Sequence, residues 1–161
     1  MAEVYLGLGS NVGNRIAQLA GARDAISSNV GEILAESSIY DTAPWGPIPQ
    51  DNYLNQVIRI STQLPPRDLL AALHEIERAA WRDQANEVRY GPRTLDLDIL
   101  IYGDETVHED GLTIPHPRIS ERAFVLVPLA EIAPGLVLDG TPVQEVLGRI
   151  DAKTVARYDP I

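Results

Sequence analysis

Residues 94–102, which read TLDLDILIY, constrain the fold of this chain more than any other segment. In a β-strand, successive side chains alternate between the two faces of the sheet. The odd-numbered residues here are all Leu or Ile, so they share one face, which we expect to pack in the core. The even-numbered residues include Asp96 and Asp98, so both carboxylates point the same way. Because a buried carboxylate without a counter-charge destabilises a fold strongly, the pattern predicts a cationic partner for this pair.

The remaining sequence predicts alternating strands and helices around this segment. β-Forming runs predict three further strands and helical spacing of apolar residues predicts two helices: strands at 4–8, 33–40 and 53–62, helices at about 15–30 and 66–81. Asn14 is placed to cap the first helix and Gly31 to end it. We therefore expect an α+β protein with a ferredoxin-like βαββαβ core, in which an antiparallel sheet is flanked by helices, followed by a C-terminal extension. No flexible linker interrupts the chain, which predicts a single domain over residues 1–161.

Composition restricts the kinds of partner. The chain has 161 residues and a formal net charge of −10, which argues against a general electrostatic grip on nucleic acid or on an anionic membrane. It contains no cysteine, so disulfides and cysteine zinc sites are excluded and a reducing cytoplasm is the simplest compartment. Its start resembles no secretion signal, and no apolar run approaches the ~20 residues that span a bilayer. We expect a cytoplasmic protein that binds neither nucleic acid nor membrane.

The aspartate pair suits a divalent cation. Mg²⁺ prefers oxygen ligands and takes one or two protein carboxylates while phosphates and water complete its octahedron. Asp96 and Asp98 have Cα atoms roughly 6.5 Å apart in an extended strand, so each can lean toward one shared ion or toward two neighbouring ions. The alternative is that both aspartates only form salt bridges with arginines at the sheet edge.

Arginines gather immediately before this strand. Arg78, Arg82, Arg89 and Arg93 make the window from 78 to 93 locally positive in an acidic protein. Guanidinium groups match phosphate oxygens, and a loop could close over a bound polyphosphate. A solvated charged loop is the alternative. Combined with the aspartates, the arginines point to phosphoryl transfer from a nucleotide.

Three further segments carry candidate binding groups. GLGSNVGN at 7–14 is one residue too long for a dinucleotide fingerprint, so a tight strand-to-helix turn is the better interpretation. Its backbone and the side chains of Ser10 and Asn11 could still line a small-molecule pocket. His116 lies between two prolines, which favours presenting one ring nitrogen to a ligand. Arg122 and Phe124 alternate with Ala123 and so share a side.

Aromatic and amide groups suit a flat ligand. The aromatic rings of Trp45, Tyr53 and Tyr90 could stack on a heteroaromatic ring, and the amide of Asn55 could recognise its edge. Core packing explains Tyr53 equally well, whereas Trp45 lies in a proline-rich loop, where core packing is a weaker explanation.

The motifs resemble a known family. RYGPRTLDLDIL resembles the signature of 6-hydroxymethyl-7,8-dihydropterin pyrophosphokinase, a folate-pathway enzyme, and GLGSN, SSIYDTAPWGP, DNYLNQV, TIPHPRISERAF and PLAEIAPGL follow in the family's order. The resemblance covers nearly the whole chain. It implies a ferredoxin-like core and transfer of the β,γ-pyrophosphoryl group of ATP to the hydroxymethyl group of the pterin, releasing AMP. ATP and 6-hydroxymethyl-7,8-dihydropterin would be the substrates, and we expect a monomer.

The resemblance also assigns roles by position. For catalysis and metal binding it implies Arg82, Arg93, Asp96 and Asp98, the two aspartates ligating two Mg²⁺ ions. For ATP it implies His74, Glu77, Arg89, Arg93, His116 and Arg122, with His74 standing where the family has a glutamine. For the pterin it implies Thr42, Tyr53, Asn55, Tyr90 and Phe124. Where the family commonly shows G-R-x-R, this chain reads Trp81-Arg82-Asp83-Gln84, so a second loop arginine is missing.

Two other functions remain compatible with the residues themselves. One is a different Mg²⁺-dependent enzyme of the same layout, such as a nucleotidyl transferase or a phosphohydrolase. The other is a non-catalytic ligand-binding or assembly module in which Asp96 and Asp98 bind arginines.

Overall fold

The structure, a computed structural model, describes residues 1–43, 50–81 and 95–158, with the backbone alone for Trp81. Its elements follow one another along the chain in this order: β1 (Ala2–Ser10), α1 (Arg15–Asn29), β2 (Gly31–Glu36), β3 (Tyr40–Thr42), β4 (Tyr53–Thr62), α2 (Pro66–Trp81), β5 (Asp96–Tyr102), β6 (Val107–Glu109), β7 (Leu112–Ile114), the 3₁₀ turn η1 (Ile119–Glu121), α3 (Ala123–Ile132), β8 (Val137–Leu138), β9 (Thr141–Pro142), α4 (Val143–Gly148) and β10 (Val155–Arg157). The mixed composition of helices and an antiparallel sheet confirms the predicted α+β class.

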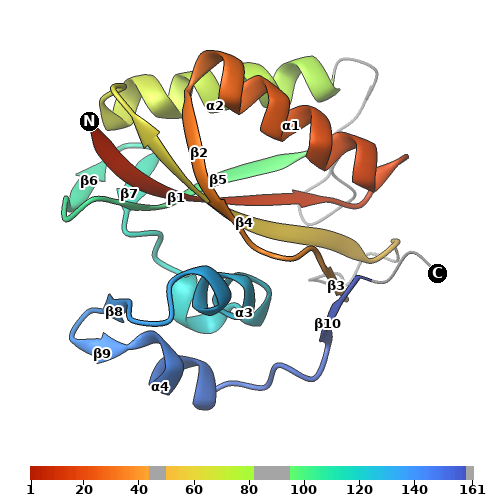
Figure 1. The fold of residues 1–161 in the computed structure, drawn as a ribbon, viewed down its shortest axis with the longest axis vertical. Helices are drawn as coiled ribbons and strands as arrows, with labels where there is room; N and C mark the ends of the chain where they lie inside the picture. Colours follow the sequence, from red (N-terminus) through yellow and green to blue (C-terminus); the bar gives the residue numbers. More distant parts are fainter. Residues whose placement is uncertain (44–49, 82–94, 159–161) are drawn as a thin grey trace.

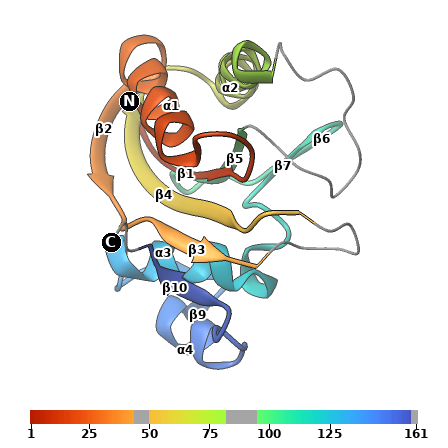
Figure 2. The ribbon, with the colours of Figure 1, turned by 90° about the vertical axis from the view of Figure 1, so that its right-hand side faces the viewer.

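The molecule has three layers (Figures 1 and 2). Helices α1 and α2 cover one face of the main sheet, and α3 and α4 lie on the other side. The main sheet has the strand order β10-β3-β4-β1-β5, with β2 also paired to β4, and every pair is antiparallel. The predicted strand at 33–40 is two short strands, β2 and β3. The C-terminal extension adds β10 beside β3, as a continuation of the same sheet.

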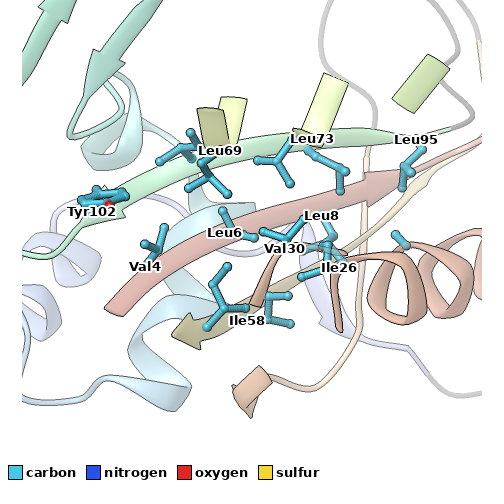
Figure 3. Packing of buried hydrophobic residues seen from close by; sticks show 14 of the residues in the cluster. Val4, Leu6, Leu8, Ile26, Val30, Ile58, Leu69, Leu73, Leu95 and Tyr102 are labelled. Carbon is cyan, nitrogen blue, oxygen red and sulfur yellow. The ribbon is translucent and has the colours of Figure 1, made fainter. Parts of the chain in front are cut away.

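The main core lies between the sheet and the two helices α1 and α2 (Figure 3). Leu6 and Leu8 of β1 point into it beside Ile26 of α1 and Leu69 and Leu73 of α2, all almost wholly buried. The apolar stripe predicted for α2 is therefore the stripe that packs on the sheet. Because even-numbered residues of β1 face this core, its odd-numbered residues face the opposite side, toward α3.

Strand β5 departs from strict alternation near its end. Its pairing with β1 shifts by one residue between Leu6, which lies opposite Ile99, and Tyr5, which lies opposite Ile101. The extra residue, Leu100, forms a β-bulge, after which the faces exchange. Ile101 consequently packs in the second core cluster, under α3, and Tyr102 in the first. The prediction that Ile101 shares the face of Leu97 and that Tyr102 shares the face of Asp98 was therefore wrong. A β-bulge cannot be recognised in a continuous run of Leu and Ile, because the sequence pattern there is the same with or without it.

The turns around α1 show why particular small residues occur there. The side chain of Asn14 accepts a hydrogen bond from the backbone N–H of Ala17 at 3.1 Å, which confirms the predicted cap. Gly31 opens β2 directly beside β4, and a Cβ built on it would lie 2.2 Å from the carbonyl oxygen of Ser61. Gly31 is thus required by a close approach of two backbones.

Two glycine substitutions should have opposite effects on stability. Gly31→Ala should destabilise by about 2–3 kcal/mol, because the backbone of β2 must move away from β4. Gly21→Ala should stabilise by about 0.5–1 kcal/mol, because Gly21 lies inside α1 and no atom of the described residues beyond this helix turn would come within 4 Å of a Cβ there. Urea unfolding of both variants measures the two values; an unchanged midpoint for Gly31→Ala would contradict the close approach.

One carboxylate joins α3 to β3 and β10, the strands at the edge of the sheet opposite β5. Glu131 of α3 accepts hydrogen bonds from the hydroxyl of Tyr40 at 2.6 Å and from the backbone N–H and hydroxyl of Ser38 at 3.1 and 2.9 Å. Arg157 of β10 lies 3.9 Å away. Burial opposes ionisation of Glu131, but these donors outweigh it and lower the pKa of the carboxyl below its usual value.

The contribution of Glu131 should disappear in acid. A carboxyl whose pKa is lowered by folding stabilises the protein above its unfolded-state pKa, about 4.3, and that stabilisation is lost as pH falls through the lower folded-state value. Glu131→Gln should therefore lower the melting temperature at pH 7, and the gap to the parent should narrow steadily below about pH 4. Thermal unfolding of both proteins from pH 7 to pH 3 measures the gap; a constant gap would contradict this assignment.

Candidate active site

Two glycines in β1 open a space on the α3 side of the sheet. Gly9 lies opposite Asn55 of β4 and opposite Asp96 of β5, and Gly7 lies opposite Asp98. Their missing side chains leave a trough between β4 and β5, with the carboxylates along one edge and Asn55 on the other. The predicted turn at 7–14 is therefore correct only from residue 11 onward, since the strand runs through both glycines to Ser10.

This trough forms a cavity, which we call the glycine pocket. Its volume is about 170 Å³, and α3 closes it from the other side. The residues that line it come from β1, β3, β4, β5 and the start of α3: Gly7, Leu8, Gly9, Thr42, Ala43, Tyr53, Asn55, Gln56, Val57, Asp96, Asp98, Arg122, Phe124 and Val125. All the described residues predicted to bind the pterin lie here, with both aspartates and Arg122.

The amide of Asn55 is fixed in orientation. Its Nδ2 donates to the hydroxyl oxygen of Thr42 at 2.7 Å, and both side chains are buried. A Cβ on Gly9 would lie 2.8 Å from Oδ1 of Asn55, so that oxygen occupies the space that glycine leaves. The arrangement presents an amide oxygen and a hydroxyl group side by side at the cavity wall.

Arg122 supplies a cation at the opposite wall. Its guanidinium carbon lies 5.5 Å from the centre of the Phe124 ring, close enough for a cation–π interaction. Its Nε is buried, and no hydrogen-bond acceptor is present for it among the residues that the structure describes. A buried N–H without an acceptor is costly, which favours an anionic ligand at this point.

A second cavity, which we call the α2 pocket, lies on the other side of Asp98. It has a volume of about 360 Å³ between α2, β5 and the β6–β7 hairpin. Its lining residues are Leu70, His74, Glu77, Leu97, Asp98, Ile99, Gly111, Leu112, Thr113, His116 and Pro117. Asp98 lines both cavities, so a ligand in each would meet at this carboxylate.

His116 is held by its backbone and by its own ring. Its N–H donates to the carbonyl oxygen of Leu100, the bulged residue of β5, at 2.9 Å. Its Nδ1 accepts from the N–H of Arg118 at 3.1 Å, so the neutral ring carries its proton on Nε2. Burial lowers the pKa of His116 against the opposing pull of Asp98, and Arg122 and Arg118 add to the lowering. Near neutral pH the imidazole ring is therefore uncharged and can donate a hydrogen bond from Nε2.

The predicted site residues fall into these two cavities with few exceptions. Thr42, Tyr53, Asn55, Phe124, Arg122 and both aspartates line the glycine pocket, and His74, Glu77 and His116 line the α2 pocket. Trp45, Arg82, Arg89, Tyr90 and Arg93 lie outside the described residues.

Two details of the sequence interpretation need correction. Ser10 is buried on the opposite face of the sheet from the glycine pocket, and Asn11 donates to Gln50 and to the carbonyl of Asp51, joining two loops. The backbone of the segment 7–14 does line the glycine pocket, at Gly7, Leu8 and Gly9. The lining residues that were not predicted are Ala43, Gln56, Val57 and Val125. For the two glycines, the sequence already held a signal that favours the pocket over a turn. Their i, i+2 spacing in a strand was the available signal.

Comparison with known proteins gives a consistent answer. Residues 5–134 match the family model described as 7,8-dihydro-6-hydroxymethylpterin-pyrophosphokinase (HPPK). A relative from Methylorubrum extorquens named 2-amino-4-hydroxy-6-hydroxymethyldihydropteridine pyrophosphokinase is 44% identical over 160 residues, covering 99% of this chain and all of the relative. A protein of the same name from Haemophilus influenzae is 44% identical over 89% of each chain.

Longer proteins contain a similar region. A mitochondrial folate synthesis bifunctional protein of Pisum sativum is 43% identical over 88% of this chain but 27% of its own length. The crystal structure of wild-type HPPK-DHPS from Plasmodium falciparum matches 98% of this chain with a TM-score of 0.74 at 14% identity. This chain spans about half of that one, 47%, and the likeness concerns the fold.

The chain therefore belongs to the 7,8-dihydro-6-hydroxymethylpterin-pyrophosphokinase family. Both the family and the pyrophosphokinase function predicted from the sequence are confirmed.

Substitution of Gly9 should lower the affinity for the pterin without changing the affinity for the nucleotide. In Gly9→Ala the new methyl group displaces the Asn55 amide, so affinity for 6-hydroxymethyl-7,8-dihydropterin should fall about tenfold, as expected for one lost hydrogen bond. The resemblance implies that His74, Glu77 and His116 of the α2 pocket bind the nucleotide, and this pocket does not include Gly9, so nucleotide affinity should stay unchanged. Calorimetric titration measures both affinities.

Gly7→Ala is the matched control. The atoms nearest to a Cβ there belong to the Leu100 side chain, at 3.6 Å and beyond, which is ordinary van der Waals contact. Its effect on pterin affinity should remain within about threefold. Equal losses in the two variants would contradict a specific role for the space beside Asn55.

Proposed function

We propose that this chain is a Mg²⁺-dependent pyrophosphokinase that binds the pterin alcohol in the glycine pocket and ATP in the α2 pocket. The observation that carries the proposal is the position of Asp98, which lines both cavities. The hydroxymethyl oxygen attacks the β-phosphorus of ATP, forming one P–O bond. The bond from that phosphorus to the bridging oxygen of the α-phosphate breaks, AMP leaves with the bonding electrons, and the hydroxyl proton is released.

The residues present fit Mg²⁺. Asp96 and Asp98 are half-buried oxygen donors on one strand face, and none of the ion pairs among the described residues involves Asp98. Among the same residues, no cluster of three or more acidic or histidine side chains could hold a metal ion without further ligands. Two carboxylates without a third protein ligand suit a cation that completes its octahedron with phosphate oxygens and water. When bound, Mg²⁺ would neutralise charge on the phosphates.

Other side chains orient the substrates. Oδ1 of Asn55 and the hydroxyl group of Thr42 would read the edge of the pterin ring, and Phe124 and Tyr53 would contact its faces. Arg122 would pair with a phosphate through its guanidinium group, whose Nε–H has no acceptor among the described residues. His116 would donate from Nε2 to another phosphate oxygen. His74 would contribute a further polar contact at the entrance of the α2 pocket.

For four residues the proposal rests on the sequence resemblance alone. Arg82 and Arg93 would stabilise the phosphates during transfer, Arg89 would bind ATP, and Tyr90 would stack on the pterin.

The finer structural expectations are also part of the proposal. We assign the fold to the ferredoxin-like βαββαβ type, because β1 lies between β4 and β5. The strands β2 and β3 each pair with β4 and together occupy one strand position beside it. A monomer is supported by the scattered, small set of large exposed apolar residues within the described ranges: Met1, Ile16, Leu34 and Val137. The absence of cysteine fits a cytoplasmic location. No helix in the described parts of the chain is long and apolar enough to cross a bilayer.

Product analysis tests the function directly. Incubation with ATP, Mg²⁺ and 6-hydroxymethyl-7,8-dihydropterin should yield AMP and the pterin diphosphate in equal amounts. A nucleotidyl transferase would instead attach AMP to the pterin and release pyrophosphate. A binding module would give no turnover, and either result would refute the proposal.

Replacement of either aspartate should abolish turnover and leave the fold intact. Asp96→Ala and Asp98→Ala each should lower kcat by at least about a thousandfold, because a major electrostatic contribution to the transition state is lost. Melting temperatures should stay close to the parent value, and excess chelator should silence the parent. Asp41→Ala, on β3 and absent from both pockets, is the control and should retain activity. Full Mg²⁺-dependent activity in both variants would show that the metal assignment is wrong.

A further inference from the structure

The strand that carries the aspartate pair lies at the end of the main sheet. In the described strand order β5 has β1 on one side and no strand beyond it. Its outward backbone groups therefore need partners from elsewhere. Around Asp98 two such groups are satisfied: the N–H of Leu97 donates to Oε2 of Glu77 at 2.8 Å, and the carbonyl of Leu100 accepts from His116.

Glu77 is an unusual residue to find in this place. It is only 8% exposed, and its carboxylate reaches from α2 to the backbone of the one residue that separates Asp96 from Asp98. A buried carboxylate on an amphipathic helix is expensive to desolvate unless it accepts hydrogen bonds. Neighbouring Glu75, by contrast, is exposed and pairs with Arg78 on the same helix. The hydrogen bond from Leu97 of β5 is thus one contact that offsets the burial of the Glu77 carboxylate.

The direction of this contact matters for the carboxylates. Side chains at 96 and 98 project to the α3 side of the sheet, while Leu97 projects to the α2 side and is buried under the helix. Anchoring the N–H of Leu97 fixes the peptide plane between Asp96 and Leu97. It also restricts the backbone of Asp96 and of Asp98, which flank Leu97. The spacing between the two carboxylates is therefore fixed by a contact from α2, on the opposite side of the sheet.

We propose that Glu77 is a positioning residue that takes the place of a neighbouring strand and holds β5 in register, so that Asp96 and Asp98 share one orientation. It acts through the backbone of Leu97. This differs from the role as a direct nucleotide contact that its position by resemblance suggests. The inference rests on the proposed metal-binding function of the aspartate pair.

Amide hydrogen exchange in the metal-free, nucleotide-free protein tests the contact itself. Exchange of the Leu97 amide, followed by NMR, should be at least about tenfold faster in Glu77→Ala than in the parent, because its acceptor is gone. Glu77→Gln keeps an acceptor oxygen at the same distance along the side chain, so its Leu97 amide should stay within about threefold of the parent. Glu75→Gln, two residues away and exposed, is the matched control and should leave the amide unchanged.

Activity then separates positioning from nucleotide contact. In Glu77→Ala the Mg²⁺ concentration for half-maximal activity should rise about fivefold or more and kcat should fall, while KM for the pterin alters little. Glu77→Gln should restore both to within about threefold. Direct titration of a non-hydrolysable ATP analogue without metal should give equal affinities for the parent and both variants.

Two results would overturn the proposal. If Glu77→Gln is as impaired as Glu77→Ala while its Leu97 amide stays protected, the charge of Glu77 is what matters. If the Leu97 amide is unaffected in Glu77→Ala but metal-free nucleotide affinity falls, Glu77 contacts the nucleotide directly. Should Glu77→Ala not fold, the Gln variant alone decides between these cases. Failure of the metal assignment itself would appear separately, as activity retained by the aspartate variants.

Discussion

The row Asn55–Gly9–Asp96 across three adjacent strands is the constraint on which the candidate site depends. The Cβ of any side chain at Gly9 would lie 2.8 Å from Oδ1 of Asn55 and would compete with it for space. It would also narrow the cavity between Asn55 and the carboxylate of Asp96. The cavity thus exists because the central strand contributes only backbone there, while its neighbours on either side contribute polar side chains. The same strand buries Leu6 and Leu8 on its other face, and this fixes the register that keeps the row aligned.

β5 joins the two cavities because it is both an edge strand and an irregular one. Its inner edge pairs with β1, which places Asp98 opposite Gly7, beside the glycine pocket. At its outer edge, the N–H of Leu97 donates to Glu77 and the carbonyl of Leu100 accepts from the backbone N–H of His116. The bulge at Leu100 turns a carbonyl outward at the point where the loop bearing His116 passes. A regular, longer strand would present the same groups to another strand, which would cover Asp98 from that side.

The parts of this arrangement that depend on local pattern could be predicted from the sequence. The stripe of Leu69 and Leu73, the Asn14 cap and the common face of Asp96 and Asp98 all follow from the periods of helix and strand. The Leu100 bulge and the capping of Leu97 by Glu77 could not be predicted, because they depend on which strand lies beside β5 and on the absence of a further one in the described sheet. Glycines show the same limit. Gly7 and Gly9 are typical turn formers in sequence, which does not distinguish a glycine that bends the chain from one that makes room. The sequence therefore allowed a pocket lined by this backbone but favoured a turn.

Local electrostatics reconciles the net charge of −10 with the proposed binding of a polyphosphate beside a carboxylate. The protein does not attract the phosphates with its whole surface; it supplies local donors, of which Arg122 is positioned with a buried N–H lacking an acceptor in the described structure. His116 serves differently, because burial and two arginines lower its pKa and keep the ring neutral near pH 7. A neutral Nε2–H can donate to a phosphate oxygen without forming a permanent ion pair with Asp98. In the proposed function, the carboxylate of Asp98 would therefore stay available to a cation that binds with the nucleotide, and Arg122, His116 and Asp98 would have separate roles.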